Sequence, residues 1–202
     1  IELSATPNPA FNVYYAGWDA RDAASNGVTG IHHPAGDTKR ISIDNDAQTI
    51  TSVGGSVSPG NGNFLRIGAW DVGTTEGGSS GSGLWSNSGR KIVGTLSAGN
   101  AGCSNTSGSD WYGRFNRSYY AGTTSSNRLL EWLNPINCNL DNIAGINNNS
   151  TANALCNSDG SGGGSSGGGS SGGGSSGDGS SGGGGSLAWL SLLLCAPLLL
   201  RT

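Results

Sequence analysis

The segment with the clearest potential for chemistry is Thr75-Glu76-Gly77-Gly78-Ser79-Ser80-Gly81-Ser82-Gly83. Ser80 has a glycine two residues before it and another directly after it, and glycine tolerates the backbone dihedrals of a tight, exposed turn. Such a turn can present a serine hydroxyl as a nucleophile. It can also aim the backbone N–H groups of Gly78 and Ser80 at one point about 3 Å away, where an oxyanion forms during acyl transfer. The segment therefore predicts acyl-transfer chemistry at Ser80.

A flexible Gly/Ser loop is the alternative interpretation, because Gly-Ser-Ser-Gly recurs between residues 164 and 182. Those copies lie in a stretch of almost pure Gly and Ser. Ser80, in contrast, is followed by Leu84-Trp85 and by the strand-like Lys91-Ile92-Val93-Gly94-Thr95-Leu96. These apolar residues indicate that the segment around Ser80 belongs to a folded unit.

The composition narrows the class of protein. The 202 residues include 38 glycines, and short apolar runs alternate with turn residues over roughly residues 1–136, which predicts an all-β domain. The formal charge is -3 without a basic cluster, so we expect no nucleic-acid partner. Methionine is absent, and we therefore expect a leader or further sequence to precede Ile1 in the gene product.

Several elements must position the serine. Strand-like segments occupy residues 11–15, 39–43, 64–67, 91–97 and 110–115, each with β-forming residues between turn signals. One short helix is predicted over residues 128–133, because Leu129, Leu130 and Leu133 lie on one face and Asn134-Pro135 ends the pattern.

The chain has two histidines, His32 and His33. One hypothesis makes either of them the general base for Ser80, with Asp37 orienting it. Consecutive strand residues point to opposite faces, so at most one histidine could reach the site. The alternative is that both pack at a strand end before Pro34. Local sequence favours a solvated loop acid at Asp110, which pairs with Arg114 or caps a turn, because this arrangement is common.

The four cysteines are Cys103, Cys138, Cys156 and Cys195. Spaced cysteines in a chain poor in charge suit a secreted, oxidising setting. Cys138 and Cys156 bracket an Asn-rich loop, and we expect a disulfide between them, worth about 3 kcal/mol through loop entropy. Cys103 is then left to a partner outside this chain.

The carboxy-terminal part is a separate segment with its own composition. Residues 158–186 are almost only Gly and Ser, which predicts a disordered linker. The apolar run 187–200 follows, and as a helix its 14 residues would span about 21 Å, less than the ~30 Å of a bilayer core. A processed sorting tail explains this run better than a permanent anchor.

Seven stretches of residues 1–136, taken together and in order, resemble the lysyl endopeptidase family of trypsin-like bacterial serine proteases. They are Asn8-Pro9-Ala10-Phe11-Asn12, Ala16-Gly17-Trp18-Asp19, Ile31-His32-His33-Pro34, Lys39-Arg40-Ile41-Ser42, Thr75-Glu76 before Gly78-Ser79-Ser80-Gly81-Ser82, Ser109-Asp110 before Tyr112-Gly113-Arg114, and Leu130-Glu131-Trp132-Leu133-Asn134-Pro135.

The resemblance implies roles for particular residues. Ser80 would be the acyl-forming nucleophile, with the N–H groups of Gly78 and Ser80 as the oxyanion hole. Asp110 would be the acid that selects a substrate lysine. Ser97-Ala98-Gly99 would pair with the substrate backbone, although the family often carries His-Gly-Gly there, which leaves the preference for lysine over arginine open. The chemistry requires no cofactor, and we expect neither a cofactor nor a metal.

The resemblance also implies that this chain is the second of two β-barrels. In the family the triad order is His, Asp, Ser, and the paired histidines are not the base. Both partners of Ser80 would therefore lie upstream of Ile1, and we expect this chain alone to have little or no activity. The family counterpart of Cys103 bonds a cysteine near the mature amino terminus.

The tail from Gly182 through Arg201 resembles the Gly-Gly carboxy-terminal sorting signal of Gram-negative bacteria. That resemblance implies transient anchoring in the inner membrane through residues 187–200. A rhomboid-type sorting protease would then remove the apolar helix, and the protein would be exported to the cell surface or released.

The expected organisation is therefore a trypsin-like carboxy-terminal barrel over residues 1–136, an Asn-rich loop with its disulfide over 137–157, a linker over 158–186 and an apolar tail helix over 187–202. The expected function is hydrolysis of proteins or peptides after lysine, and after arginine if the preference is not strict. The alternatives are a surface binding module that lost catalysis and a structural display protein whose function depends more on the linker and apolar tail than on the barrel.

Overall fold

The computed structural model describes residues 3–134 and 140–147. Its main element is a nine-stranded sheet in which seven strands follow the order β4-β3-β7-β8-β9-β6-β5. These strands are β3 (Asn26–His32), β4 (Arg40–Ala47), β5 (Thr49–Thr51), β6 (Phe64–Ile67), β7 (Gly83–Ser86), β8 (Lys91–Gly99) and β9 (Asp110–Arg114). The other two are β2 (Gly17–Asp19), which pairs in parallel with the start of β8, and β10 (Asn142–Ile143), which pairs with β2.

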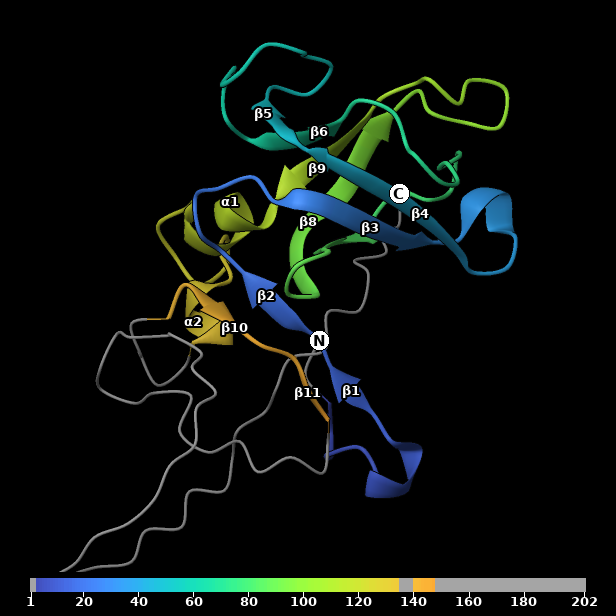
Figure 1. The fold of residues 1–202 in the computed structure, drawn as a ribbon. Helices are drawn as coiled ribbons and strands as arrows, with labels where there is room; N and C mark the ends of the chain where they lie inside the picture. Colours follow the sequence, from blue (N-terminus) through green and yellow to red (C-terminus); the bar gives the residue numbers. More distant parts are fainter. Residues whose placement is uncertain (1–2, 135–139, 148–202) are drawn as a thin grey trace, which may run out of the picture.

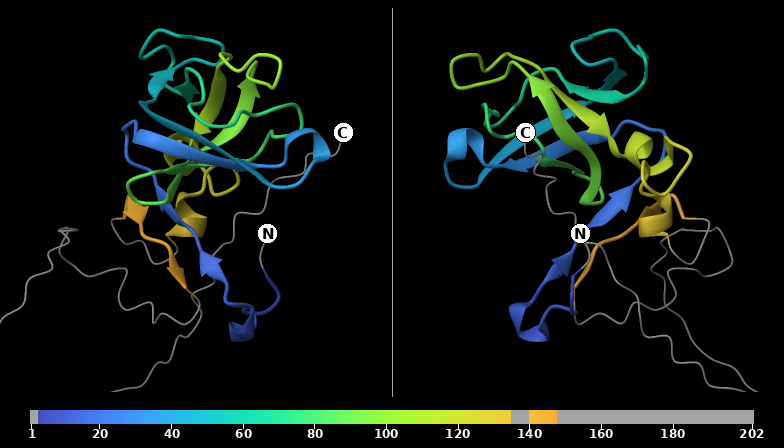
Figure 2. Two further views of the ribbon diagram at one scale, coloured as in Figure 1. Left: turned by 45° about the vertical axis from the view of Figure 1, so that its right-hand side comes forward. Right: turned by 180° about the vertical axis from the view of Figure 1, so that it is seen from behind.

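The sheet curls round on itself. Strands β4 and β5 stand at opposite ends of the order, yet Gln48 alone separates them in the chain. An antiparallel backbone bridge between Ile43 and Val72 brings the loop that contains Val72 against the free edge of β4. Figure 1 and Figure 2 show the resulting curved half-barrel, with β1 (Tyr14–Tyr15) and β11 (Ile146–Asn147) paired away from it. The prediction of an all-β carboxy-terminal barrel is confirmed.

Two apolar clusters hold this arrangement. The first fills the barrel and is made of alternate, inward-facing strand residues, with Trp70 from a loop: Val28, Leu65, Ile67, Trp70, Leu84, Val93, Leu96 and Tyr112. The second lies between β2 and the helices, where Trp18 packs on Tyr119 with ring centroids 4.8 Å apart and on Phe115 at 5.8 Å. Such aromatic pairs add about 0.5–1.5 kcal/mol each beyond the area that they bury.

The helical segments differ from expectation in one place. Helix α2 (Leu130–Leu133) lies within the predicted helix, but α1 (Phe115–Tyr120) follows β9 directly, where sequence predicted that the strand would include Phe115. Phe115 and Tyr119 are spaced i, i+4, so a helix places both rings against Trp18. Within the described residues, none of the helices is long and apolar enough to cross a membrane.

The amino-terminal strand is also shorter than predicted. Residues Pro9–Phe11 form the 3₁₀ turn η1, and Asn12 follows with a left-handed φ of 49°. Only Tyr14–Tyr15 of the predicted strand 11–15 pairs, as β1. Asn tolerates this left-handed conformation, and a residue that adopts it interrupts an extended run.

Candidate active site

Ser80 lies on an exposed turn that leads into β7. The Ser79 N–H donates to the Glu76 carbonyl at 3.0 Å, and Gly78 has a φ of 90°, so residues 76–79 form a type II turn. The turn is then fastened to β8, because the Gly81 N–H donates to the Leu96 carbonyl at 2.8 Å. The predicted need for glycine at Gly78 is real, since a side chain at positive φ is strained.

Three backbone N–H groups of residues 76–82 have no acceptor within residues 3–134 and 140–147, those of Gly77, Gly78 and Ser80. Ser79, Gly81 and Ser82 all donate their N–H groups to carbonyl oxygens. The Gly77 carbonyl accepts from the Ala35 N–H at 2.7 Å. Because a trans peptide holds its C=O and N–H on opposite sides, the Gly78 N–H points away from Ala35. The arrangement can accept an anion at the front of the turn.

Asp110 begins β9 and is buried, with 1% of its surface exposed. Its Oδ2 accepts from Trp70 Nε1 at 2.7 Å and from Thr75 Oγ1 at 2.6 Å. Its Oδ1 has no hydrogen-bond partner among the described residues. The interpretation of Asp110 as a solvated loop acid paired with Arg114 is therefore wrong. Thr75 opens the segment that carries Ser80, so one hydrogen bond joins the carboxylate to the serine loop.

The unpaired Oδ1 of Asp110 is buried and packs against Gly99. These two residues are opposite each other in the β8–β9 pairing. A Cβ atom on Gly99 would lie 1.8 Å from Asp110 Oδ1, so the carboxylate oxygen occupies the place where any other residue would carry its Cβ. Ser97 lies at the irregularity between Leu96 and Ala98 and is exposed. The structure thus places Gly99 opposite Asp110 and Ala98 opposite Trp111, while the pairing of residues 97–99 with a substrate backbone stays a prediction.

The two histidines do not serve Ser80. His32 is buried, and its Nδ1 and Nε2 hydrogen-bond to Ser79 Oγ at 2.9 Å and to Ser42 Oγ at 3.0 Å. Burial lowers the pKa of His32 below its usual 6.5, although the charge of Asp110 raises it in part. His33 Nδ1 donates to the backbone carbonyl of Asp37 at 3.1 Å. The hypothesis of a base oriented by Asp37 is wrong, because that carboxylate binds Arg40.

A second nucleophile near the turn is disfavoured by its surroundings. The Cys103 thiol hydrogen-bonds to Glu76, and this contact and the charge of Glu76 raise the pKa of the thiol. The Glu76 carboxylate also accepts from the Cys103 backbone N–H at 3.2 Å. Both effects favour the protonated thiol, which makes Cys103 a poorer candidate nucleophile than an unperturbed cysteine.

Comparison with known proteins agrees with this geometry. The family model described as lysyl endopeptidase, C-terminal domain, matches residues 1–113, more than half of the chain. The chain belongs to this family. A lysyl endopeptidase of Pseudomonas aeruginosa is 44% identical over 86 residues, which cover 42% of this chain and 17% of that relative. The chain therefore matches less than a fifth of the length of this lysyl endopeptidase.

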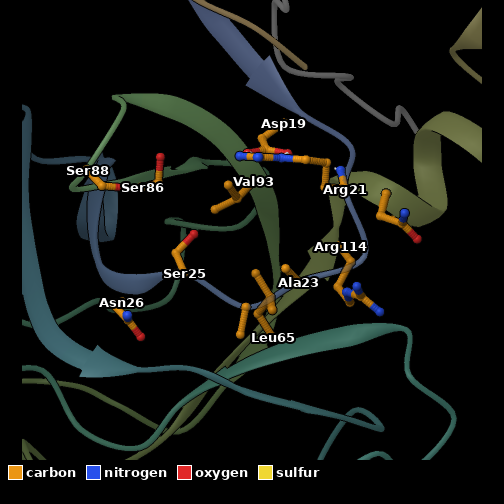
Figure 3. A pocket seen from close by; sticks show the side chains of 12 residues that line it. Asp19, Arg21, Ala23, Ser25, Asn26, Leu65, Ser86, Ser88, Val93 and Arg114 are labelled. Atoms are coloured by element: carbon orange, nitrogen blue, oxygen red, sulfur yellow. Dashed lines mark hydrogen bonds and ion pairs between the residues drawn. The ribbon is translucent and has the colours of Figure 1, made fainter. Parts of the chain in front are cut away.

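A further cavity, which no motif of the sequence indicated, lies elsewhere in the domain. The cavity has a volume of about 270 Å³ and lies between β2, the segment after it and the β7–β8 hairpin (Figure 3). The charged groups around it are already paired, Arg21 with Asp19 at 2.5 Å and Arg114 with Asp22. Neither Ser80 nor Asp110 lines it, so it is separate from the candidate site.

Some predicted site features fall outside the described residues. They are Cys138, Cys156, the linker over 158–186 and the apolar tail over 187–202. Within the described part of the chain, no group of three or more His, Cys, Asp or Glu side chains could hold a metal ion.

Proposed function

We propose that this chain is the carboxy-terminal part of an exported serine endopeptidase that hydrolyses peptide bonds after lysine. The observation that supports this most strongly is the buried Asp110 carboxylate, which has one oxygen bound by Trp70 and Thr75 and the other without a hydrogen-bond partner against Gly99. A buried carboxylate oxygen without a partner is costly. A substrate ammonium that reaches Oδ1 removes that cost.

The single unpaired oxygen favours lysine over arginine. An ammonium is a compact point charge that one oxygen can accept, whereas a guanidinium binds best when both carboxylate oxygens are available. Since Oδ2 already accepts two hydrogen bonds, a bidentate pair with arginine would have to displace Trp70 or Thr75. Ser97 to Gly99 would hold the substrate backbone next to this pocket.

Acyl transfer then takes place on the serine turn. Ser80 Oγ attacks the carbonyl carbon of the lysine residue, and the N–H groups of Gly78 and Ser80 donate hydrogen bonds to the developing oxyanion. The amine leaves after it receives a proton, and water hydrolyses the Ser80 ester to release the carboxylate. We propose that the histidine that carries these protons, and the aspartate that orients it, precede Ile1 in the gene product, so that the present chain alone is inactive.

The same proposal covers location and processing. The Cys138–Cys156 disulfide and the Gly-Gly tail would suit a Gram-negative protein that is exported, held briefly in the inner membrane through residues 187–200, and then cleaved by a sorting protease. Its partners would be peptide or protein substrates and that protease.

The test uses the full gene product and three variants, Ser80→Ala, Asp110→Asn and His33→Ala. We expect the wild type and His33→Ala to hydrolyse a lysyl p-nitroanilide, Ser80→Ala to lose turnover, and Asp110→Asn to lose at least about 100-fold in kcat/KM. A folded wild-type protein without turnover that still binds lysyl peptides would contradict the protease and favour the binding module.

A further inference from the structure

The back of the serine turn is held by one short segment, His32 to Gly36. This segment contains the end of β3 and the 3₁₀ turn η2 (Pro34–Gly36). It contacts the turn twice: His32 Nδ1 hydrogen-bonds to Ser79 Oγ at 2.9 Å, and the Ala35 N–H donates to the Gly77 carbonyl at 2.7 Å. The two contacts lie on either side of Gly78, whose N–H is free.

His32 is fixed by a buried chain of hydrogen bonds. Its Nε2 pairs with Ser42 Oγ on β4, and Ser79 Oγ also accepts from the Glu76 N–H at 3.3 Å. His32, Ser42 and Ser79 are each no more than 1% exposed. A neutral imidazole has one donor and one acceptor, and a hydroxyl can be either, so both nitrogens are satisfied in either tautomer. Satisfied buried networks of this kind are rigid.

Ala35 shows that the backbone of this segment is held in one conformation. It has a φ of 52°, in the left-handed region that residues other than glycine rarely adopt. The Cβ of a residue at Gly78 would lie only 3.3 Å from the Ala35 nitrogen, so the two segments are in close contact. Strained backbone of this kind persists where its surroundings over-determine it.

These contacts stabilise one of two possible orientations of a single peptide group in the turn. Type I and type II turns differ by rotation of the central peptide, here the one between Gly77 and Gly78. In the observed orientation the carbonyl faces Ala35 and the Gly78 N–H faces the front. After rotation the carbonyl oxygen would face the front, where it would repel an oxyanion, and the Ala35 N–H would lose its acceptor.

We propose that His32 is a positioning residue, which acts through Ser79, together with Ala35, to hold the oxyanion-binding turn in its open orientation. The proposal rests on the function proposed above. It gives the buried histidine a role in the acyl-transfer step without proton transfer to Ser80.

The experiment compares two inhibitors on the full gene product. A peptide aldehyde ending in lysinal forms a tetrahedral adduct that uses the oxyanion site, whereas n-butylamine occupies only the lysine pocket. We expect His32→Ala to weaken the aldehyde and to lower kcat by at least about tenfold, since loss of one oxyanion donor costs about 10²–10³. Inhibition by n-butylamine should change less than about threefold. His32→Asn, whose amide can replace Nδ1, should recover part of the loss, and the neighbouring His33→Ala should match the wild type.

The outcomes separate the two claims. If His32→Ala fails to fold, Ser79→Ala removes the same contact without a cavity, and it should give the same pattern. Wild-type aldehyde affinity and kcat in the folded variant, or equal weakening of both inhibitors, would overturn the positioning role while the proposed function stands. A wild-type protein that neither cleaves lysyl substrates nor binds either inhibitor would overturn both.

Discussion

Replacement of Gly99 by alanine tests whether Asp110 must keep its carboxylate against residue 99 to bind the substrate. The new Cβ would lie 1.8 Å from Oδ1 and 2.9 Å from Cγ of Asp110, so the carboxylate must rotate away. Rotation moves Oδ2 from Trp70 and Thr75, and hydrogen bonds to a charged group contribute about 1.5–3 kcal/mol each. Loss of one such interaction with the substrate ammonium lowers kcat/KM by roughly 10-fold to 150-fold. We therefore predict about a 100-fold loss on a lysyl p-nitroanilide.

The control for this change is Gly102→Ala. Gly102 lies in the neighbouring loop, and a Cβ there would come no closer than 4.0 Å to the Thr75 carbonyl oxygen. It should leave kcat/KM within about twofold of the wild type. Hydrolysis of p-nitrophenyl acetate, which carries no lysine side chain, should survive in Gly99→Ala because Ser80 and its turn are unchanged. A folded Gly99→Ala protein that cleaves the lysyl substrate within threefold of the wild type would refute the reasoning.

Three further predictions follow from buried polar groups. Thr75→Val removes one donor from Asp110 Oδ2, so the ratio of arginyl to lysyl kcat/KM should rise by about tenfold, and an unchanged ratio in ester assays would contradict the single-oxygen explanation. The pKa of His32 is lowered by burial, so the unfolded state binds more protons and stability falls as the pH drops below about 6.5. The Tm of His32→Asn should not show this dependence on pH, and a dependence equal to that of the wild type would mean that another group causes it. Burial raises the pKa of Asp44, so stability falls as the pH rises through that pKa. Asp44→Asn should therefore raise Tm at pH 7 but not at pH 3. An unchanged Tm at pH 7 would show that other groups compensate the charge of the Asp44 carboxylate.

The chemical candidates were readable from sequence because they are local. Ser80 was recognisable from its glycines, and the strand that follows it showed that the turn is folded. Local sequence alone favoured a loop acid at Asp110, and only the family resemblance implied an acid that selects lysine. What decides between them is Trp70 and Thr75, which lie 40 and 35 residues away in the chain. The residues that flank Asp110 in the sequence do not predict those hydrogen-bond partners.

Long-range packing explains what the sequence did not predict. The contact between His32 and Ser79 joins residues 47 apart, and adjacent histidines suggest a base more readily than a backbone support. Helix α1 was missed because Phe115 continues the alternation of β9, while the decision to turn into a helix comes from Trp18, almost a hundred residues earlier. In both cases tertiary contacts override the local signal.

The central claim, that Ser80 is an activated nucleophile in the full gene product, is tested most directly by covalent labelling. A fluorophosphonate reacts with a serine that has a general base and an oxyanion site. Intact-mass and peptide-mass spectrometry should show one phosphonyl group on the peptide that contains Ser80 and none on the Ser80→Ala variant. A folded wild-type protein that takes up no label, or an equal label on Ser80→Ala, would contradict the account.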